Sequence, residues 1–155
     1  MPSEYEFIRL RLNMIERQLQ SPRSEYIYTG DGRGRRRTEA DVDTRQEKLY
    51  QREARLLRHI LAHIPDGLVR QALSGWQSKF GTFLARHRER YSAQQDSYDA
   101  WWRLPPHERA RMPRPPRPPL ARFTDQLGQE WIIDDTFLRI LDDISARLDK
   151  WIEEP

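Results

Sequence analysis

The chain has 155 residues, of which 37% are hydrophobic and 33% charged, and its mean hydropathy is −0.94. This length fits one domain with one hydrophobic core, and the 5 Trp, 6 Tyr and 5 Phe exclude disorder throughout. The lack of cysteine excludes disulfides, thiolate metal sites and a cysteine nucleophile, and fits a reducing compartment. Because no apolar run is long enough to span a bilayer and no secretory signal opens the chain, we expect a cytoplasmic protein with no membrane association.

Charge is sorted by segment, although the net charge is only +3. Four arginines fall within residues 33–37, and five arginines with seven prolines and one acid fall within residues 105–122. Residues 123–155 carry nine acids against three bases, a local net of −6. Such sorting indicates a surface that meets partners. The 24 arginines against three lysines fit carboxylate or phosphate recognition, but GC-rich coding would give the same excess.

The first predicted element is a helix from about Glu4 to Gln20. Ser3 and Glu6 form an S-x-x-E capping box, and apolar residues follow at helical spacing. Ser21-Pro22 marks its end.

Residues 21–38 form a predicted Gly/Arg-rich arm. Tyr26 and Tyr28 run into three glycines at positions 30, 32 and 34, which permit a tight turn. The sequence fits a short hairpin or extended arm, and it fits a flexible loop equally well. The glycines lack the following Gly-Lys-Ser/Thr of a phosphate-binding loop.

Two further helices follow. The second should begin near Thr38 to Asp41 and continue to about His63, and a turn signal covers residues 64–67. The third begins at Leu68 and extends as far as about Trp102. Glycines at positions 75 and 81 in this helix predict a bend or a close helix crossing.

Residues 105–122 predict a stiff polyproline connector, with one helical turn between residues 107 and 112. Three P-x-x-P frames begin at positions 113, 115 and 116, but none has the flanking arginine of an SH3 ligand. A spacer is the simpler interpretation.

The last segment, residues 123–155, predicts an acidic C-terminal helix with Asp134 or Asp135 as N-cap. Its apolar residues recur at alternating intervals of four and three, the seam of a bundle: Phe137, Leu141, Ile144, Leu148 and Trp151. The predicted fold is all-α, an antiparallel bundle of three to four main helices in a single domain over residues 1–155. The Gly/Arg-rich arm and the connector are its appendages.

Candidate catalytic and metal sites are weak. His59 and His63 lie four apart on one helical face, but the Glu of the zinc-protease motif is missing, so ordinary solvent-facing or core-edge histidines are the better interpretation. Asp135, Asp142 and Asp149 are spaced by seven, which fits a solvated face or a docking surface better than acid/base chemistry. We therefore expect no catalytic residue, no metal site and no cofactor.

The partner-binding candidates come from the basic segments and the aromatics near them. For phosphate or partner binding they are Arg33, Arg35, Arg36, Arg37, Arg111, Arg114 and Arg117. For stacking or an interface they are Tyr26, Tyr28, Trp101 and Trp102. We expect one of the two adjacent tryptophans in the core and the other at an interface.

These features predict a non-enzymatic helical adaptor, or a small subunit of an assembly. It would bind other protein chains through its arginine-rich connectors and its amphipathic C-terminal helix. A nucleic-acid-binding accessory protein is the alternative, although the acidic C-terminal segment opposes it. A bundle enzyme with an unrecognised site is the third hypothesis. The chain shows no family motif and resembles many small bacterial accessory proteins in pattern only.

Overall fold

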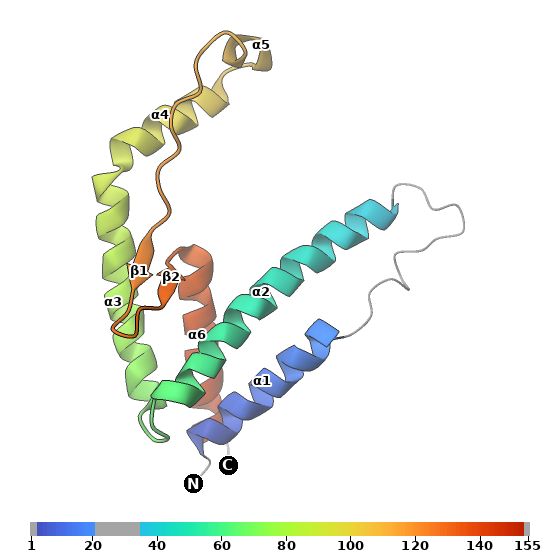
Figure 1. Ribbon diagram of the computed structural model, residues 1–155, viewed down its shortest axis with the longest axis vertical. Helices are drawn as coiled ribbons and strands as arrows, with labels where there is room; N and C mark the ends of the chain where they lie inside the picture. Colours follow the sequence, from blue (N-terminus) through green and yellow to red (C-terminus); the bar gives the residue numbers. More distant parts are fainter. Residues whose placement is uncertain (1–2, 21–34, 154–155) are drawn as a thin grey trace. The chain divides into compact units, whose positions relative to one another are not determined.

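The computed structural model describes residues 3–20 and 35–153, with the backbone alone for residues 35–44. It is 73% helical, which confirms the all-α prediction. Six helices and one hairpin make up the described chain (Figure 1). They are α1 (Glu4–Gln20), α2 (Arg35–His63), α3 (Val69–Arg90), α4 (Ser92–Arg103), α5 (Pro106–Arg109), β1 (Arg122–Thr124), β2 (Glu130–Ile132) and α6 (Asp135–Glu153).

The chain divides into two compact units. Unit 1 comprises residues 1–73 and 143–155, and unit 2 comprises residues 74–142. Helices α3 and α6 each contribute residues to both units. The organisation as a single domain stays a prediction.

Unit 1 is built on α1 and α2, which lie side by side (Figure 1). Ile8 and Ile15 of α1 and Leu57 and Ile60 of α2 are fully buried, because their helical spacing places them on the facing sides. Ile144 and Leu148, from the end of α6, complete this core.

The N-termini of α1 and α3 cap each other in unit 1. The buried carboxylate of Glu4 accepts the backbone N–H groups of Val69 and Arg70, both at 2.9 Å. In return, Asp66 accepts the hydroxyl of Ser3 at 2.6 Å and the backbone N–H of Tyr5 at 3.3 Å. Each carboxylate therefore satisfies donors that the first turn of a helix leaves open.

A bidentate ion pair joins α1 to α2. Arg11 donates from Nε to Glu53 Oε2 at 2.6 Å and from Nη2 to Oε1 at 3.0 Å. The two side chains are only 17% and 11% exposed. The hydrogen bonds to Glu53 raise the pKa of Arg11, so the guanidinium stays charged despite its burial.

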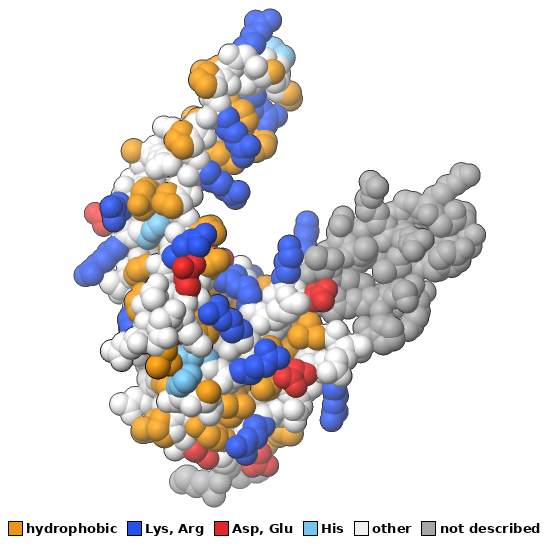
Figure 2. Space-filling view, in the orientation of Figure 1, with side chains coloured by type: hydrophobic (Ala, Val, Ile, Leu, Met, Phe, Trp, Pro, Cys, Tyr) orange, Lys and Arg blue, Asp and Glu red, His pale blue; other side chains and the backbone are white. Residues whose placement is uncertain are grey.

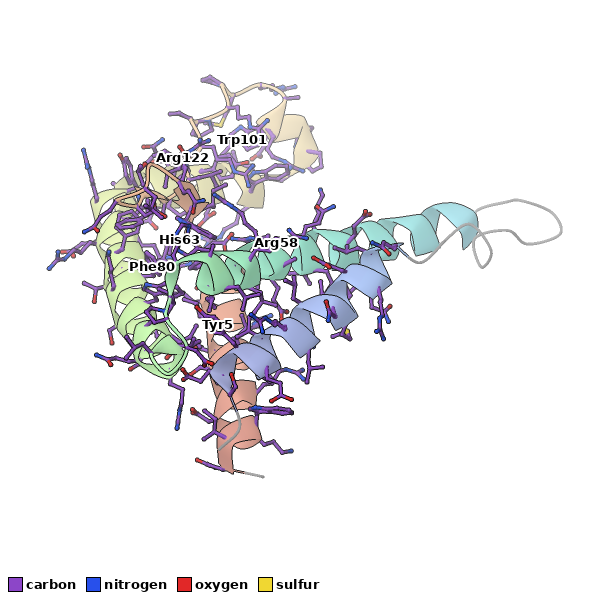
Figure 3. All side chains as sticks on the ribbon, turned by 60° about the horizontal axis from the view of Figure 1, so that its bottom comes forward. Tyr5, Arg58, His63, Phe80, Trp101 and Arg122 are labelled. Carbon is purple, nitrogen blue, oxygen red and sulfur yellow. The ribbon has the colours of Figure 1, made fainter. Side chains whose placement is uncertain are left out.

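The core of unit 2 is aromatic. Phe80 (labelled in Figure 3) packs edge-on against Phe123 and Phe137, with ring centroids 5.2 and 5.5 Å apart. Trp131 lies 6.1 Å from Phe137. These contacts join α3, the hairpin and the start of α6.

The antiparallel hairpin β1–β2 corrects the prediction for residues 123–155, because helix α6 occupies only the part from Asp135 onward. Asp125 accepts the backbone N–H groups of Leu127 and Gln129, both at 2.9 Å, and the indole N–H of Trp131 at 2.9 Å. Gly128 adopts a φ of +80°, which glycine tolerates without strain. The turn is thus encoded by an Asp and a Gly that periodicity does not detect.

Several predicted boundaries and features also differ. Helix α2 begins at Arg35, so the last residues assigned to the Gly/Arg-rich arm belong to a helix. The third predicted helix is divided at Tyr91 into α3 and α4. The close crossing expected at Gly75 and Gly81 is wrong, because a Cβ on either would meet no described atom within 4 Å.

Helix α6 begins as predicted. Asp134 accepts the backbone N–H of Phe137 at 2.8 Å, the N-cap interaction expected there. The seam residues from Phe137 to Leu148 are buried, so the apolar face of this helix is used within the chain.

Candidate partner-binding site

Helix α4 presents three aromatic side chains on one face. Tyr98, Trp101 and Trp102 follow the spacing i, i+3 and i+4, which places them together. The helix ends at Leu104, whose φ of −68° and ψ of 149° are extended because Pro105 follows. The proline thus turns the chain away directly after the aromatic residues.

The proline-rich segment returns along α4 and α3 within unit 2 (Figure 1). Helix α5 forms the turn, with Pro106 in its first position, where a missing N–H is harmless. Gln94 of α4 donates to the carbonyl of Arg117 at 3.2 Å, and His87 of α3 donates from Nε2 to the carbonyl of Pro119 at 2.8 Å. Because prolines lack N–H groups, side-chain donors hold this segment in place of a backbone ladder.

These contacts favour the spacer interpretation of the P-x-x-P frames. The segment from residue 113 to residue 121 forms neither helix nor strand, as expected of a polyproline connector. Its carbonyls at Pro116 and Arg117 accept hydrogen bonds from Gln94 of the same chain. The helical turn expected between residues 107 and 112 is present as α5, one residue earlier.

The returning segment brings three arginines onto the aromatic face of α4. Guanidinium carbons lie over ring centroids in five pairs, an arrangement that cation–π attraction stabilises. The pairs are Arg109 over Trp102 (4.9 Å) and Trp101 (5.8 Å), Arg114 over Tyr98 (5.7 Å) and Trp101 (5.8 Å), and Arg117 over Tyr98 (5.9 Å). We call Tyr98, Trp101, Trp102, Arg109, Arg114 and Arg117 the Arg–Trp cluster (Trp101 is labelled in Figure 3).

Polar contacts orient the cluster. Arg114 donates from Nη2 to the hydroxyl of Tyr98 at 3.0 Å. Hydrogen bonds from Trp102 and then Arg114 lower the pKa of that hydroxyl, because both favour the tyrosinate form. Within the described chain, the buried Nε1 of Trp101 and Nε of Arg109 have no hydrogen-bond partner. The cluster therefore holds two donors that still lack an acceptor.

The positive charge of this region is not neutralised locally. Five arginines lie between residues 103 and 117, and Glu108 is the single acid there. None of the five forms an ion pair with another described residue. Figure 2 shows basic and apolar side chains intermixed over the end of unit 2 that carries α4 and α5. Uncompensated positive charge of this kind attracts anions.

The structure brings together part of the predicted site. Arg114 and Arg117 join the cluster, whereas Arg111 is exposed and contacts no ring of the described residues. Trp101 is half-buried, and Trp102 is 49% exposed. This difference in exposure is the one expected if Trp101 belongs to the core and Trp102 to an interface. The roles of the two tryptophans stay predictions.

The other predicted partner-binding residues do not enter the cluster. Tyr26, Tyr28 and Arg33 lie outside the described residues. Arg35, Arg36 and Arg37 form the first turn of α2, and their side chains lie outside the described part.

Two members of the cluster, Tyr98 and Arg109, were not among the predicted partner-binding residues. The aromatic spacing of α4, which is visible in the sequence, groups Tyr98 with the two tryptophans. Arg109 carries no comparable signal, because its position over Trp102 depends on the return of the chain after α5.

The acidic stripe of α6 is bonded within each unit. In unit 2, Asp135 accepts from Arg88 and Asp142 accepts from Gln77, at 2.8 and 2.7 Å. In unit 1, Asp149 accepts from Arg70 at 2.8 Å. The stripe therefore helps to hold α6 against α3, in addition to facing solvent.

The histidine pair lies side by side on α2, with the ring centroids of His59 and His63 4.8 Å apart. Among the described residues, no group of three or more His, Cys, Asp or Glu could hold a metal ion. Within the same residues, no helix is long and apolar enough to cross a bilayer.

Comparisons with known proteins identify no relative: no family model, curated protein or solved structure matches the chain.

Proposed function

We propose that the protein is a non-enzymatic helical adaptor, a small subunit that uses the Arg–Trp cluster to bind an acidic surface of another protein. The observation that carries this proposal is the set of uncompensated arginines around the half-exposed Trp102. Tryptophan and arginine are the residues that most often dominate the binding free energy of protein interfaces.

Apolar side chains around the cluster support a protein partner. Met112 and Leu120, on the returning segment, are 53% and 55% exposed, although each is large and apolar. Methionine and aromatic residues are enriched at interfaces, and they would be covered by a partner that also pairs with the arginines. The bonded proline segment would present these groups with little loss of conformational entropy.

Binding of single-stranded nucleic acid is the second candidate. The exposed ring of Trp102, with Arg109 beside it, resembles the combination on which unpaired bases stack. Phosphates would pair with the neighbouring arginines, and affinity would fall steeply with salt.

The test is co-purification with the untagged protein, assayed for both protein and nucleic acid, in wild type and in Trp102→Ala/Arg117→Glu, which changes two exposed members of the cluster. We expect a protein partner that the double variant loses. The matched control is Arg45→Glu/Leu127→Ala, which changes an exposed arginine and an exposed apolar residue outside the cluster. A partner retained equally by both variants would contradict the proposal.

A titration with defined probes separates the two candidates. An acidic peptide that contains leucine, and prolines that keep it from forming a helix, should bind the wild type and not the double variant, and an oligothymidine should bind weakly. Binding of the oligothymidine alone, lost steeply with added salt, would replace the adaptor function with the nucleic-acid function.

A further inference from the structure

A second surface, in unit 1, has the character of a binding site and is independent of the Arg–Trp cluster. A groove of about 460 Å³ lies between α1 and the end of α6. It is lined by Phe7, Leu10, Arg11, Met14, Arg147, Lys150 and Trp151, which we call the α1–α6 groove.

The floor of the groove is apolar. Phe7 and Trp151 lie with ring centroids 6.1 Å apart, and the indole of Trp151 donates to the carbonyl of Ser3 at 3.3 Å. Leu10 is 53% exposed although it belongs to the first helix of the unit. The floor is therefore an apolar surface that the other described residues leave open.

The rim of the groove is basic, and none of the described acidic residues lines it. The guanidinium of Arg11 is already bonded to Glu53. Arg147 and Lys150 form no ion pair with any other described residue, so their charge is available to an occupant. An occupant that fits must be apolar on the face that enters and acidic on the flanks.

The spacing along α1 indicates the shape of that occupant. Phe7, Leu10 and Met14 follow i, i+3 and i+7, which extends over roughly 10 Å of a helix axis, or two turns. An acyl chain is usually held in an enclosed cavity, whereas this groove leaves Leu10 half-exposed. A helix laid along the groove would cover Leu10 and reach both free cations.

We infer that the α1–α6 groove binds an acidic amphipathic helix of another protein chain. Apolar residues at i, i+3 or i+4, and i+7 of that helix would pack on Phe7, Leu10 and Trp151. Its glutamates or aspartates would pair with Arg147 and Lys150. Together with the Arg–Trp cluster, this groove would give the chain two separate binding surfaces, as an adaptor requires.

The test uses the full chain and a fluorescein-labelled helical peptide, with leucines at i, i+3, i+4 and i+7 and glutamates on the flanks. Anisotropy at low ionic strength should show saturable binding. Leu10→Glu should weaken it about tenfold or more, because a half-exposed leucine can change without loss of the fold. The matched control Leu68→Glu, at a residue that is 48% exposed in the same unit, should bind like wild type.

Charge reversal gives a second, reciprocal measurement. Arg147→Glu/Lys150→Glu should lose the glutamate peptide and gain a peptide whose glutamates are replaced by lysines. Lys48→Glu, an exposed lysine on α2, is the control. In NMR spectra, the indole N–H signal of Trp151 should shift on binding to wild type.

Three outcomes would overturn the inference. The first is that neither peptide binds wild type at low ionic strength. The second is that Leu10→Glu and Leu68→Glu bind equally. The third is that a fluorescent long-chain fatty acid, and not the peptide, binds in a manner that Leu10→Glu abolishes, which would assign the groove to lipid.

Discussion

The carboxylate of Glu4 accepts the backbone N–H of Val69 at 2.9 Å, so the first turn of α1 caps the first turn of α3, 65 residues later in the chain. A residue that periodicity assigns to the start of one helix thereby determines the start of another. It is buried, as few glutamates are, because both of its oxygens have backbone donors.

We expect Glu4→Gln to destabilise unit 1. The amide oxygen can still accept from one backbone N–H, but the NH₂ group faces the other donor, which should lower the free energy of unfolding by about 2 kcal/mol. Urea denaturation followed by circular dichroism measures the loss. Glu6→Gln, an exposed residue in the same turn, should change stability little; equal effects of the two substitutions would contradict the capping role.

The reciprocal cap, in which Asp66 accepts from Ser3 and Tyr5, predicts that stability depends on pH. The hydrogen bond from Ser3, and then backbone N–H groups, lower the pKa of Asp66. Because the folded pKa lies below the unfolded value of about 3.9, this stabilisation is present above that value and is lost as the pH falls through the folded pKa. Urea unfolding across acidic pH should show Asp66→Asn less stable than wild type near neutrality, with a difference that closes in acid. Asp96→Asn is the exposed control; a difference independent of pH would argue against ionisation.

Two ion pairs between α1 and α2, Arg11–Glu53 and Arg58–Glu16, allow a matched comparison of burial. Glu53→Gln removes a bidentate partner from Arg11 in a largely buried setting and should cost about 2 kcal/mol. Glu16→Gln removes the single 3.1 Å contact with Arg58 at the surface and should cost less than about 1 kcal/mol. Chemical denaturation of both variants measures the ratio. Equal losses would show that burial does not strengthen the first pair.

The hairpin should depend on Asp125. Asp125→Ala removes the acceptor for two backbone N–H groups and for the indole of Trp131, with an expected loss of about 2 kcal/mol in stability. The fluorescence of Trp131 should move to longer wavelength as its surroundings loosen. The exposed neighbour Gln126→Ala serves as control, and unchanged fluorescence in Asp125→Ala would contradict this role.

Within the Arg–Trp cluster, the pKa of Tyr98 should lie below the ordinary value of a tyrosine. Its pKa is lowered by hydrogen bonds from Trp102 and Arg114, so the folded state favours tyrosinate. The resulting stabilisation is present above the unfolded pKa of about 10 and is lost as the pH falls through the folded value. Arg114→Gln should raise the pKa of Tyr98, measured by NMR on carbon-labelled tyrosine. Arg111→Gln, which removes an exposed arginine that contacts no ring, should leave it unchanged.

Local signals in the sequence predicted several features because their causes are local. The boundaries of α1 and the N-cap of α6 at Asp134 depend on neighbouring residues, and both predictions are confirmed. The seam from Phe137 to Leu148 is buried as its spacing requires.

Other features depend on contacts between distant residues, and periodicity could not predict them. The hairpin was not predicted because it depends on hydrogen bonds that the Asp125 carboxylate accepts and on the positive φ of Gly128. Neither feature appears in the hydrophobic periodicity. The break between α3 and α4 at Tyr91 has no proline or glycine that would indicate it in the sequence. The Arg–Trp cluster exists only because the chain reverses after α5, which sets Arg109 over Trp102. The α1–α6 groove joins residues such as Phe7 and Trp151 from opposite ends of the chain.

The discontinuous make-up of unit 1 has a consequence for biosynthesis. Ile8 and Leu57 share a core with Leu148, and the carbonyl of Ser3 accepts the indole of Trp151. During translation, the apolar side chains of α1 and α2 that pack against α6 therefore stay uncovered until α6 has emerged from the ribosome. That interval exposes the nascent chain to chaperones and to premature association.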